Sequence, residues 1–245
     1  MTKTIILIPS RLRATRLPNK PLLKINNKSL ITHVYEKGLS TNIGDVYVAT
    51  GDQEILNEVI KNNGKAILTK NEHLTGTDRI FEAYELLKRN DIDYIINLQG
   101  DEPLINKNDI INLNTLAIQN GSEIATLACT LQNKNINNKN VVKVICNKEI
   151  KKNKFSFANK FLRSLENEKN DNVYHHIGIY IYKTTTLKKF VKLKQSNNEI
   201  KLKLEQLRAL DNNIRIDVVF SNSAPVGVDT NEDYLEIKKL MEYKS

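Results

Sequence analysis

The stretch TIILIPSRLRATRLPNKPL, residues 4–22, decides the fold of this chain. It opens with a short apolar and β-branched run that ends at a turn residue, a pattern typical of a buried strand. The run leads directly into a loop that carries Arg11, Arg13, Arg16 and Lys20. In α/β sheets, ligands bind beyond the carboxyl ends of the strands. The stretch therefore predicts a buried strand followed by a basic ligand-binding loop.

Strands and helices alternate in the residues that follow. Short strands are predicted from the apolar runs at 46–49, 65–68 and 94–98, and helices from the apolar faces of 52–63 and 78–89. Gly64 follows the first of these helices as a C-cap, and Thr77 precedes the second as an N-cap. Strand–helix–strand repetition implies parallel pairing through right-handed crossovers. We therefore expect an α/β fold with a doubly wound, mostly parallel sheet.

The pattern changes after residue 124. Strands without long intervening helices are predicted at 124–131, 142–146, 155–158 and 177–182. They indicate a mixed or antiparallel insertion over approximately 124–183. A strand at 214–220, with helices at 199–210 and 231–243, completes the chain. No internal repeat or linker is evident, which predicts a single domain, 1–245.

The composition is that of a soluble globular protein. Hydrophobic residues make up 40% of the chain and charged residues 27%, and no apolar run approaches the roughly 18 residues of a membrane span. The segment before the first strand is too short for a signal peptide, so we expect a cytoplasmic protein without a membrane partner. Cys129 and Cys146 form neither a CxxC pair nor a metal-binding spacing with histidine, which predicts buried reduced thiols.

The formal net charge of +9 favours anionic ligands in general. Most lysines, however, lie in the Asn/Lys-rich stretch 133–169 and on predicted helix faces, where they are typical of solvated surface. The sequence has no interleaving of basic and aromatic residues and no nucleic-acid-binding motif, so we expect no nucleic-acid partner. The charge alone supports the alternative of a nucleic-acid-binding or regulatory nucleotide-binding protein.

The cations of the first loop suit a triphosphate. Guanidinium groups bind phosphate oxygens in pairs, and three arginines and a lysine stand within residues 11–20. The loop has neither the P-loop pattern nor the GxGxxG of a dinucleotide-binding fold. The alternative is a solvated basic turn.

Two acidic loops predict a site for Mg²⁺. Asp101 follows a glycine at the end of the strand 94–98, and Mg²⁺ is usually shared between one or two carboxylates and substrate phosphates. Asp229 would be the second carboxylate. As alternatives, Asp101 or Glu102 would cap the next helix, and Thr230 with Asp233 fits a capping box that explains the second acidic loop without function.

Arg79 and the pair of neighbouring histidines leave alternatives open. Arg79 is predicted in the first turn of a helix, where the macrodipole disfavours a cation unless an anion lies in front of it. It would bind a substrate carboxylate or form an ion pair with Asp78 or Glu82. His175 and His176 precede a strand, so at most one of them faces a pocket. No spacing typical of zinc ligands is present.

Seven blocks of sequence, in the right order, resemble the 3-deoxy-manno-octulosonate cytidylyltransferase family, whose members are also called CMP-Kdo synthetases. Each block alone would be a weak signal, but together they cover nearly the whole chain. The blocks are 9–22, 75–79, 97–103, 140–144, 176–180, 204–208 and 227–230.

The resemblance implies a nucleotide-diphospho-sugar transferase-like fold and a cytidylyltransferase reaction. CTP would activate 3-deoxy-manno-octulosonate (Kdo) to CMP-Kdo, with release of pyrophosphate, for lipopolysaccharide biosynthesis. The cofactor would be Mg²⁺, and the insertion would form the interface of a homodimer.

The resemblance also implies roles for particular residues. CTP would be bound by Pro9, Arg11, Arg16, Lys20, Gln99 and Asp101, and Mg²⁺ by Asp101 and Asp229. The sugar acid would be contacted by Arg79, Gln99, His176, Glu205 and Gln206. The catalytic set would be Arg16, Lys20, Asp101 and Asp229.

The chain departs from the family pattern at Gly51, Phe157, Phe161 and Leu202. The aspartate usual at position 51 stands one residue later here, and the other three replace an arginine, a proline and an acidic residue. These departures leave open the same chemistry on 8-amino-Kdo or a nonulosonic acid, or a non-catalytic nucleotide-binding paralogue. A glycosyltransferase is a further alternative, but Asp101 is not part of the D-x-D motif typical of that class.

Overall fold

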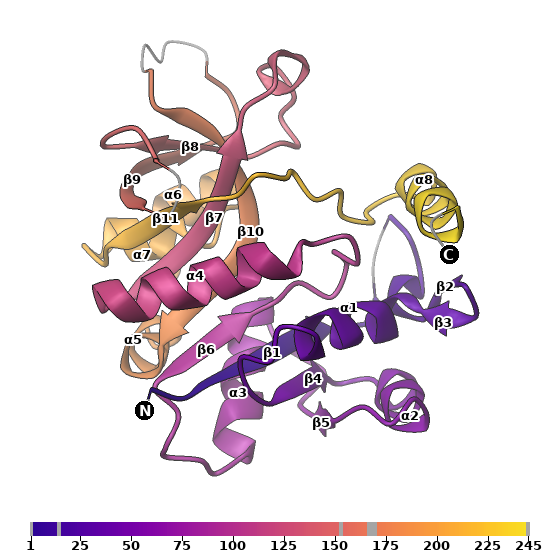
Figure 1. Cartoon of the computed structure of the whole chain (residues 1–245). Helices are drawn as coiled ribbons and strands as arrows, with labels where there is room; N and C mark the ends of the chain where they lie inside the picture. The colour runs from indigo at the N-terminus through magenta and orange to yellow at the C-terminus, as the bar shows by residue number, and fades with distance from the viewer. Residues whose placement is uncertain (1, 14–15, 152–153, 166–170, 244–245) are drawn as a thin grey trace. The chain divides into compact units, whose positions relative to one another are not determined.

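The computed structural model describes residues 2–13, 16–151, 154–165 and 171–243 (Figure 1). Residues 14 and 15 of the basic loop lie outside this range. The chain forms two compact units, one of Lys3–Lys107 with Pro225–Ser245 and one of Asn108–Ala224. Within the described ranges, no helix has both the length and the apolar character that crossing a bilayer requires.

The first unit is built on a parallel sheet with the strand order β5-β4-β1-β6. The strands are β1 (Thr4–Ser10), β4 (Val46–Thr50), β5 (Ala66–Leu68) and β6 (Tyr94–Asn97). β1 pairs in parallel with both β4 and β6, and its residues 5–8 are at most 1% exposed. A strand buried on both faces needs no polar alternation, which explains the continuous apolar run. The predicted doubly wound parallel sheet is confirmed.

Helices cover both faces of this sheet. α1 (Leu30–Leu39), α2 (Gln53–Lys61) and α3 (Gly76–Leu86) lie between its strands in the chain. A Cβ built on Gly100 would lie 3.5 Å from the side chain of Ile8 in β1 and 3.3 Å from that of Ile31 in α1. Ile8 and α1 are therefore on the same side of the sheet. The next residue, Pro9, faces α3, since its ring is 3.2 Å from a Cβ built on Gly76. Neighbouring strand residues point to opposite faces, so α1 and α3 lie on opposite sides of β1.

A small apolar core joins the end of the chain to its beginning. Its buried members are Leu17, Ile25, Leu30, Val228 and Ile237. They come from the basic loop, the short hairpin β2 (Lys24–Ile25) and β3 (Lys28–Ser29), α1, and the segment that leads into α8 (Asn231–Glu242). This core places the loop before α8 next to the basic loop, although the two are about 210 residues apart in the sequence.

The second unit is a mixed sheet with the order β10-β7-β11-β9-β8. Its strands are β7 (Ile124–Thr130), β8 (Lys143–Cys146), β9 (Phe155–Leu162), β10 (Val173–Lys183) and β11 (Ile216–Phe220). β7 and β11 are parallel and the other pairs are antiparallel. β8 also pairs with β10, so the strands close on themselves. The predicted mixed insertion is confirmed, and its residues 124–183 all belong to this unit. Both cysteines are buried free thiols, as predicted.

Several predicted element boundaries are wrong for local reasons. Thr77 lies inside α3, and Thr75 is the N-cap, with its hydroxyl accepting the N–H of Asp78. After α2, the residue in the left-handed conformation is Asn63 and not the predicted C-cap Gly64. Gly64 donates its N–H to the carbonyl oxygen of Val59. The helix predicted at 199–210 is two helices, α6 (Asn197–Leu202) and α7 (Leu207–Asp211), because Lys203 between them is left-handed, with φ of 53°.

Three helices were not predicted at all: α1, α4 (Lys107–Asn120) and α5 (Thr184–Phe190).

The capping box at the start of α8 is confirmed. Thr230 accepts the N–H of Asp233, and the Asp233 carboxylate accepts the N–H of Thr230. This accounts structurally for Asp233, but not for Asp229.

A buried ion pair joins α6 to α7. Glu199 and Arg208 are each 3% exposed, and their two contacts measure 2.9 Å from Nε to Oε2 and 2.6 Å from Nη2 to Oε1. Burial raises the pKa of Glu199, but the hydrogen bond and charge of Arg208 outweigh burial and leave the pKa below its usual value. Glu199 is therefore a buried carboxylate that depends on its arginine partner.

We expect Arg208→Met to reduce the free energy of unfolding by about 3–5 kcal/mol, because it leaves a buried carboxylate without its positively charged partner. Urea-induced unfolding measures this loss. The double variant Arg208→Met with Glu199→Gln removes both charges, and we expect it to lose less than the single variant. An equal or larger loss in the double variant would contradict this account.

Candidate active site

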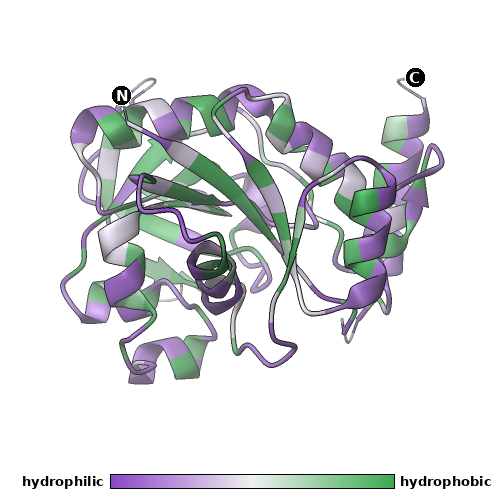
Figure 2. Ribbon diagram, turned by 90° about the horizontal axis from the view of Figure 1, so that it is seen from below, coloured by the Kyte–Doolittle hydropathy of each residue, from purple (hydrophilic) through white to green (hydrophobic). Residues whose placement is uncertain are grey.

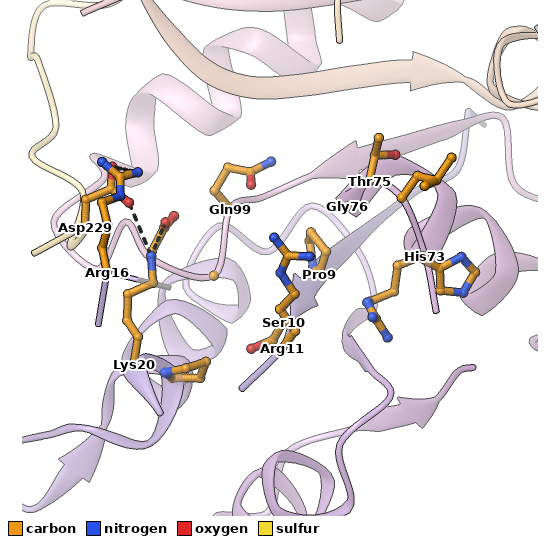
Figure 3. Close-up of a pocket in the computed structure, with 15 residues that line it drawn as sticks. Pro9, Ser10, Arg11, Arg16, Lys20, His73, Thr75, Gly76, Gln99 and Asp229 are labelled. Atoms are coloured by element: carbon orange, nitrogen blue, oxygen red, sulfur yellow. Dashed lines mark hydrogen bonds and ion pairs between the residues drawn. The ribbon is translucent and has the colours of Figure 1, made fainter. Parts of the chain in front are cut away.

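A pocket lies at the carboxyl ends of the strands of the first unit. Its free space is about 1040 Å³, open solvent included, which suits a small ligand. The lining residues are Pro9, Ser10, Arg11, Arg16, Lys20, Pro21, His73, Leu74, Thr75, Gly76, Arg79, Gln99, Gly100, Asp101 and Asp229. All eight predicted site residues that belong to this unit are among them (Figure 3).

Lys20 is the centre of the cationic end of this pocket. Its ammonium nitrogen lies 2.7 Å from Oδ2 of Asp101, 2.7 Å from the carbonyl oxygen of Val228 and 3.5 Å from Oδ1 of Asp229. The lysine stands at the start of η1 (Lys20–Leu22), after Asn19, which is left-handed with φ of 56°. One ammonium group therefore contacts two segments that are distant from it and from each other in the sequence.

Two further bonds hold these segments together. The N–H of Val228 donates to the carbonyl oxygen of Asp101 at 2.9 Å, and Nη2 of Arg16 donates to Oδ2 of Asp229 at 3.1 Å. Asp233 of the capping box also accepts the N–H of Asp229 at 3.0 Å. The helix cap thus orients the backbone from which the Asp229 carboxylate projects into the pocket.

The two carboxylates fit a shared divalent cation. Asp101 and Asp229 already reach a single positive group, the Lys20 ammonium, so they are spaced to share one. Their donors are the hard oxygens that Mg²⁺ prefers. In the described part of the chain, no group of three or more His, Cys, Asp or Glu side chains is placed to hold a metal ion. The protein would supply two carboxylates, and substrate phosphates would supply further oxygens.

Glu102 is a third acid beside this pair. Burial, followed by the charges of Asp101 and Asp229, raises its pKa to about 8, and its buried Oε2 has no hydrogen-bond partner among the described residues. Glu102 is therefore mostly protonated at neutral pH. Its neutral form avoids a third negative charge beside two carboxylates.

Arg79 lines the other end of the pocket but is only 4% exposed. Its guanidinium donates to the hydroxyl of Thr69 and to the carbonyl oxygens of Lys70 and Asn71. Burial lowers its pKa, and the nearby charge of Arg11 lowers it further. Neither ion pair considered from the sequence is formed: Glu82 binds His73 instead, and the Asp78 carboxylate accepts the hydroxyl of Thr75.

Gln99 is oriented by its neighbours. Its Nε2 donates to Oδ1 of Asn97 at 3.2 Å, and Nδ2 of Asn97 donates to the hydroxyl of Thr77 at 3.4 Å. In this orientation Oε1 of Gln99 can accept a hydrogen bond from a ligand, and the second N–H of Nε2 can donate one. Asn97, which is 2% exposed, therefore sets how Gln99 meets the pocket.

The remaining predicted site residues, His176, Glu205 and Gln206, belong to the second unit. His176 is buried on β10, with its Nε2 3.0 Å from the hydroxyl oxygen of Thr126. That hydroxyl donates to backbone carbonyls, so Nε2 must be the protonated nitrogen and Nδ1 the acceptor. Glu205 lies 3.9 Å from Arg208.

Ser10, His73, Leu74 and Thr75 line the pocket but were not among the predicted site residues. Ser10 lies in the block 9–22 and Thr75 begins the block 75–79, and this was the available signal. The lining role of His73 and Leu74 depends on the turn between β5 and α3, which no local pattern specifies.

A parallel sheet with cations and a carboxylate pair at its strand ends is the arrangement of a nucleotidyltransferase. A model of the cytidylyltransferase family matches residues 5–216. The chain is 39% identical to the 3-deoxy-manno-octulosonate cytidylyltransferase of Bartonella bacilliformis over 98% of each chain. It is 40% identical to that of Brucella canis over 94% of this chain and 92% of the relative.

A solved structure, CMP:2-keto-3-deoxy-manno-octonic acid synthetase complexed with CTP, superposes with a TM-score of 0.90 at 33% identity and full coverage of both chains. The chain therefore belongs to the cytidylyltransferase family, in its 3-deoxy-manno-octulosonate branch.

We expect His176→Gln to flatten the acid side of the stability curve. Burial, with a smaller effect of His175, lowers the pKa of His176 to about 3, whereas an unfolded histidine titrates near ~6.5. Between these values only the unfolded chain binds the proton. The free energy of unfolding therefore falls with falling pH, by up to about 1.4 kcal/mol per pH unit.

Urea-induced unfolding at a series of pH values between about 7 and about 4 measures this slope. His33→Gln, a histidine substitution in the other unit, is the matched control. A His176→Gln variant with the slope of the parent protein would contradict the assignment of a buried neutral imidazole.

Proposed function

We propose that the protein transfers CMP from CTP to Kdo, giving CMP-Kdo and pyrophosphate, a step that lipopolysaccharide biosynthesis requires. The observation that carries this proposal is the Lys20–Asp101–Asp229 cluster in a pocket lined by arginines. Relatives that carry the name of this activity match almost the full chain. The similar solved structure is a complex with CTP.

The triphosphate is bound by the cations of the first loop. Arg11, Arg16 and Lys20 all line the pocket. Guanidinium groups suit phosphate oxygens because two parallel N–H bonds can form, and fixed cations need no reorganisation as charge develops. Arg16 and Lys20 would stabilise the negative charge of the departing pyrophosphate.

Asp101 and Asp229 would hold Mg²⁺ together with phosphate oxygens. When bound, the ion neutralises phosphate charge and makes a bound hydroxyl more acidic. Lys20 now donates to these carboxylates, so its ammonium would turn from them to the phosphates when CTP is present. The cluster thus has one arrangement for the free protein and another for the complex.

The reaction is an in-line substitution at phosphorus. The anomeric hydroxyl oxygen of Kdo bonds to the α-phosphorus, and the bond to the bridging oxygen of pyrophosphate breaks, so that pyrophosphate leaves with the electron pair. The hydroxyl gives up its proton to solvent water in this step. The side chains contribute position and charge rather than a covalent intermediate.

Kdo would be recognised by hydrogen-bonding groups. Gln99 offers Oε1 and His176 offers Nδ1, both acceptors for sugar hydroxyls. Glu205 and Gln206 would add further contacts, and Arg79 is the group that the resemblance assigns to the acid. A homodimer, with the interface in the insertion 124–183, is also proposed from the resemblance, and sedimentation analysis of the full chain tests it.

One observation favours a related acid as the second candidate substrate. Phe161, which replaces a proline of the family pattern, packs edge-on against His176 with 5.0 Å between ring centroids. A departure thus contacts a proposed sugar-binding side chain. The related candidates are 8-amino-Kdo and nonulosonic acids.

We expect pyrophosphate release from CTP and Mg²⁺ with Kdo, and little with 8-amino-Kdo or N-acetylneuraminate. A coupled phosphate assay measures the three acids side by side. Release with another acid alone would keep the reaction and change the substrate. No release with any acid, from folded protein that binds CTP, would contradict the proposed activity.

We expect Asp101→Asn to lower turnover by roughly 10²-fold or more, because loss of a charge-stabilising group at the reacting phosphate costs this much elsewhere. It should also weaken the Mg²⁺ dependence of CTP binding, measured by calorimetry. Glu36→Gln, at an exposed ion pair with Lys28, is the control. Near-parent turnover of Asp101→Asn at saturating Mg²⁺ would exclude the metal assignment.

A further inference from the structure

The segment between β5 and α3, residues 69–75, forms one wall of the pocket. His73, Leu74 and Thr75 line the pocket from this segment. His73 and Thr75 lie at the opposite end from Lys20 and Asp229, with Pro9 and Gln99 between (Figure 3). We call residues 69–75 the wall segment.

Arg79 of α3 donates hydrogen bonds to the first three residues of the wall segment. Its Nη1 lies 2.6 Å from the hydroxyl oxygen of Thr69 and 3.0 Å from the carbonyl oxygen of Lys70, and its Nη2 lies 3.2 Å from the carbonyl oxygen of Asn71. Three of the five N–H groups of the Arg79 guanidinium therefore already donate to the wall segment, and the side chain is only 4% exposed.

Glu82, one helical turn further along α3, binds Lys70 and His73 of the wall segment. Its Oε2 accepts the N–H of Lys70 at 3.0 Å and lies 2.5 Å from Nε2 of His73. Burial raises the pKa of Glu82, but the hydrogen bonds from His73 and Lys70 outweigh it and leave the pKa below its usual value. Residues three apart share a helix face, so Arg79 and Glu82 hold the segment from the same side.

Gly51 allows the wall segment to lie close to the end of β4. A Cβ built on Gly51 would be 2.8 Å from both the Cα of Asn71 and the carbonyl oxygen of Lys70. No side chain fits there without moving that backbone. The aspartate that follows, Asp52, instead accepts the N–H of Leu12 in the basic loop at 2.8 Å.

We propose that Arg79 is a positioning residue for the nucleotide, not an anchor for the sugar acid. Together with Glu82 and Gly51 it fixes the wall segment against the pyrimidine base of CTP. Phosphates belong with Arg16 and Lys20 at the other end of the pocket, and two of the three residues that line the pocket from the wall segment, Leu74 and Thr75, are uncharged. Leu74 is 81% exposed, so stacking a ring on it would bury apolar area. This inference rests on the proposed function for the identity of the nucleotide.

Calorimetric titration of CTP into the protein without any sugar acid tests the inference directly. We expect Arg79→Met to weaken CTP binding roughly tenfold, the loss of one or two hydrogen bonds that order the wall. Arg79→Lys keeps the charge but not the planar fork, so it should weaken CTP binding almost as much. In turnover, the KM for CTP should rise in both variants, whereas the KM for Kdo at saturating CTP should stay within about twofold.

Two further variants separate positioning from general stability. Glu82→Gln should also raise the KM for CTP. The double variant of Arg79→Met and Glu82→Gln should lose less CTP-binding free energy than the sum of the two single losses, because both residues hold one segment. Arg89→Met is the matched control. It removes an arginine that pairs with Asp45 and Asp91 at the far end of α3, and it should leave CTP binding unchanged.

Unchanged CTP binding in Arg79→Met, with a raised KM for Kdo and rescue by Arg79→Lys, would overturn the inference and make Arg79 a sugar anchor. A lower kcat with both KM values unchanged would also overturn it, since that is the signature of a smaller folded fraction. Failure of the proposed function is a separate result. If the parent protein binds CTP but turns over no acid, the CTP titrations still decide the role of Arg79.

Discussion

The contact of one ammonium group with two carboxylates organises the candidate active site. The ammonium group of Lys20 contacts Asp101, after β6, and Asp229, before α8. It also donates to the backbone carbonyl oxygen of Val228. None of these segments would be ordered against the others by helices or strands alone. The small core around Leu17 and Val228 brings them close, and the charges then fix their register. Packing therefore determines where the acids lie, and electrostatics determines how they face one another.

Much of the first unit follows from local sequence, because β1 and its neighbours carry apolar runs that only a doubly covered strand would need. α1 was missed since its run from Leu30 directly follows a hairpin and includes Gly38. The break between α6 and α7 depends on the left-handed Lys203, a conformation that no helical pattern reveals. These misses concern conformations that tertiary contacts select over propensity.

The candidate site was predictable in its members more than in their contacts. The eight predicted residues of the first unit gather in one pocket because loops after parallel strands share one edge. What the sequence does not contain is the use of each side chain. Arg79 matches a motif, yet its guanidinium donates hydrogen bonds to Thr69, Lys70 and Asn71. Glu102 adjoins Asp101 in sequence, yet burial raises the pKa of its carboxyl group to about 8.

The close approach at Gly51 also couples positions that are distant in the sequence. An aspartate at position 51 would place its Cβ against the backbone of Asn71, so it requires the neighbouring turn to shift. The same turn carries the backbone groups that Arg79 binds, and Asp52 binds the basic loop through Leu12. A side chain at position 51 would therefore change the shape of the pocket wall without itself entering the pocket.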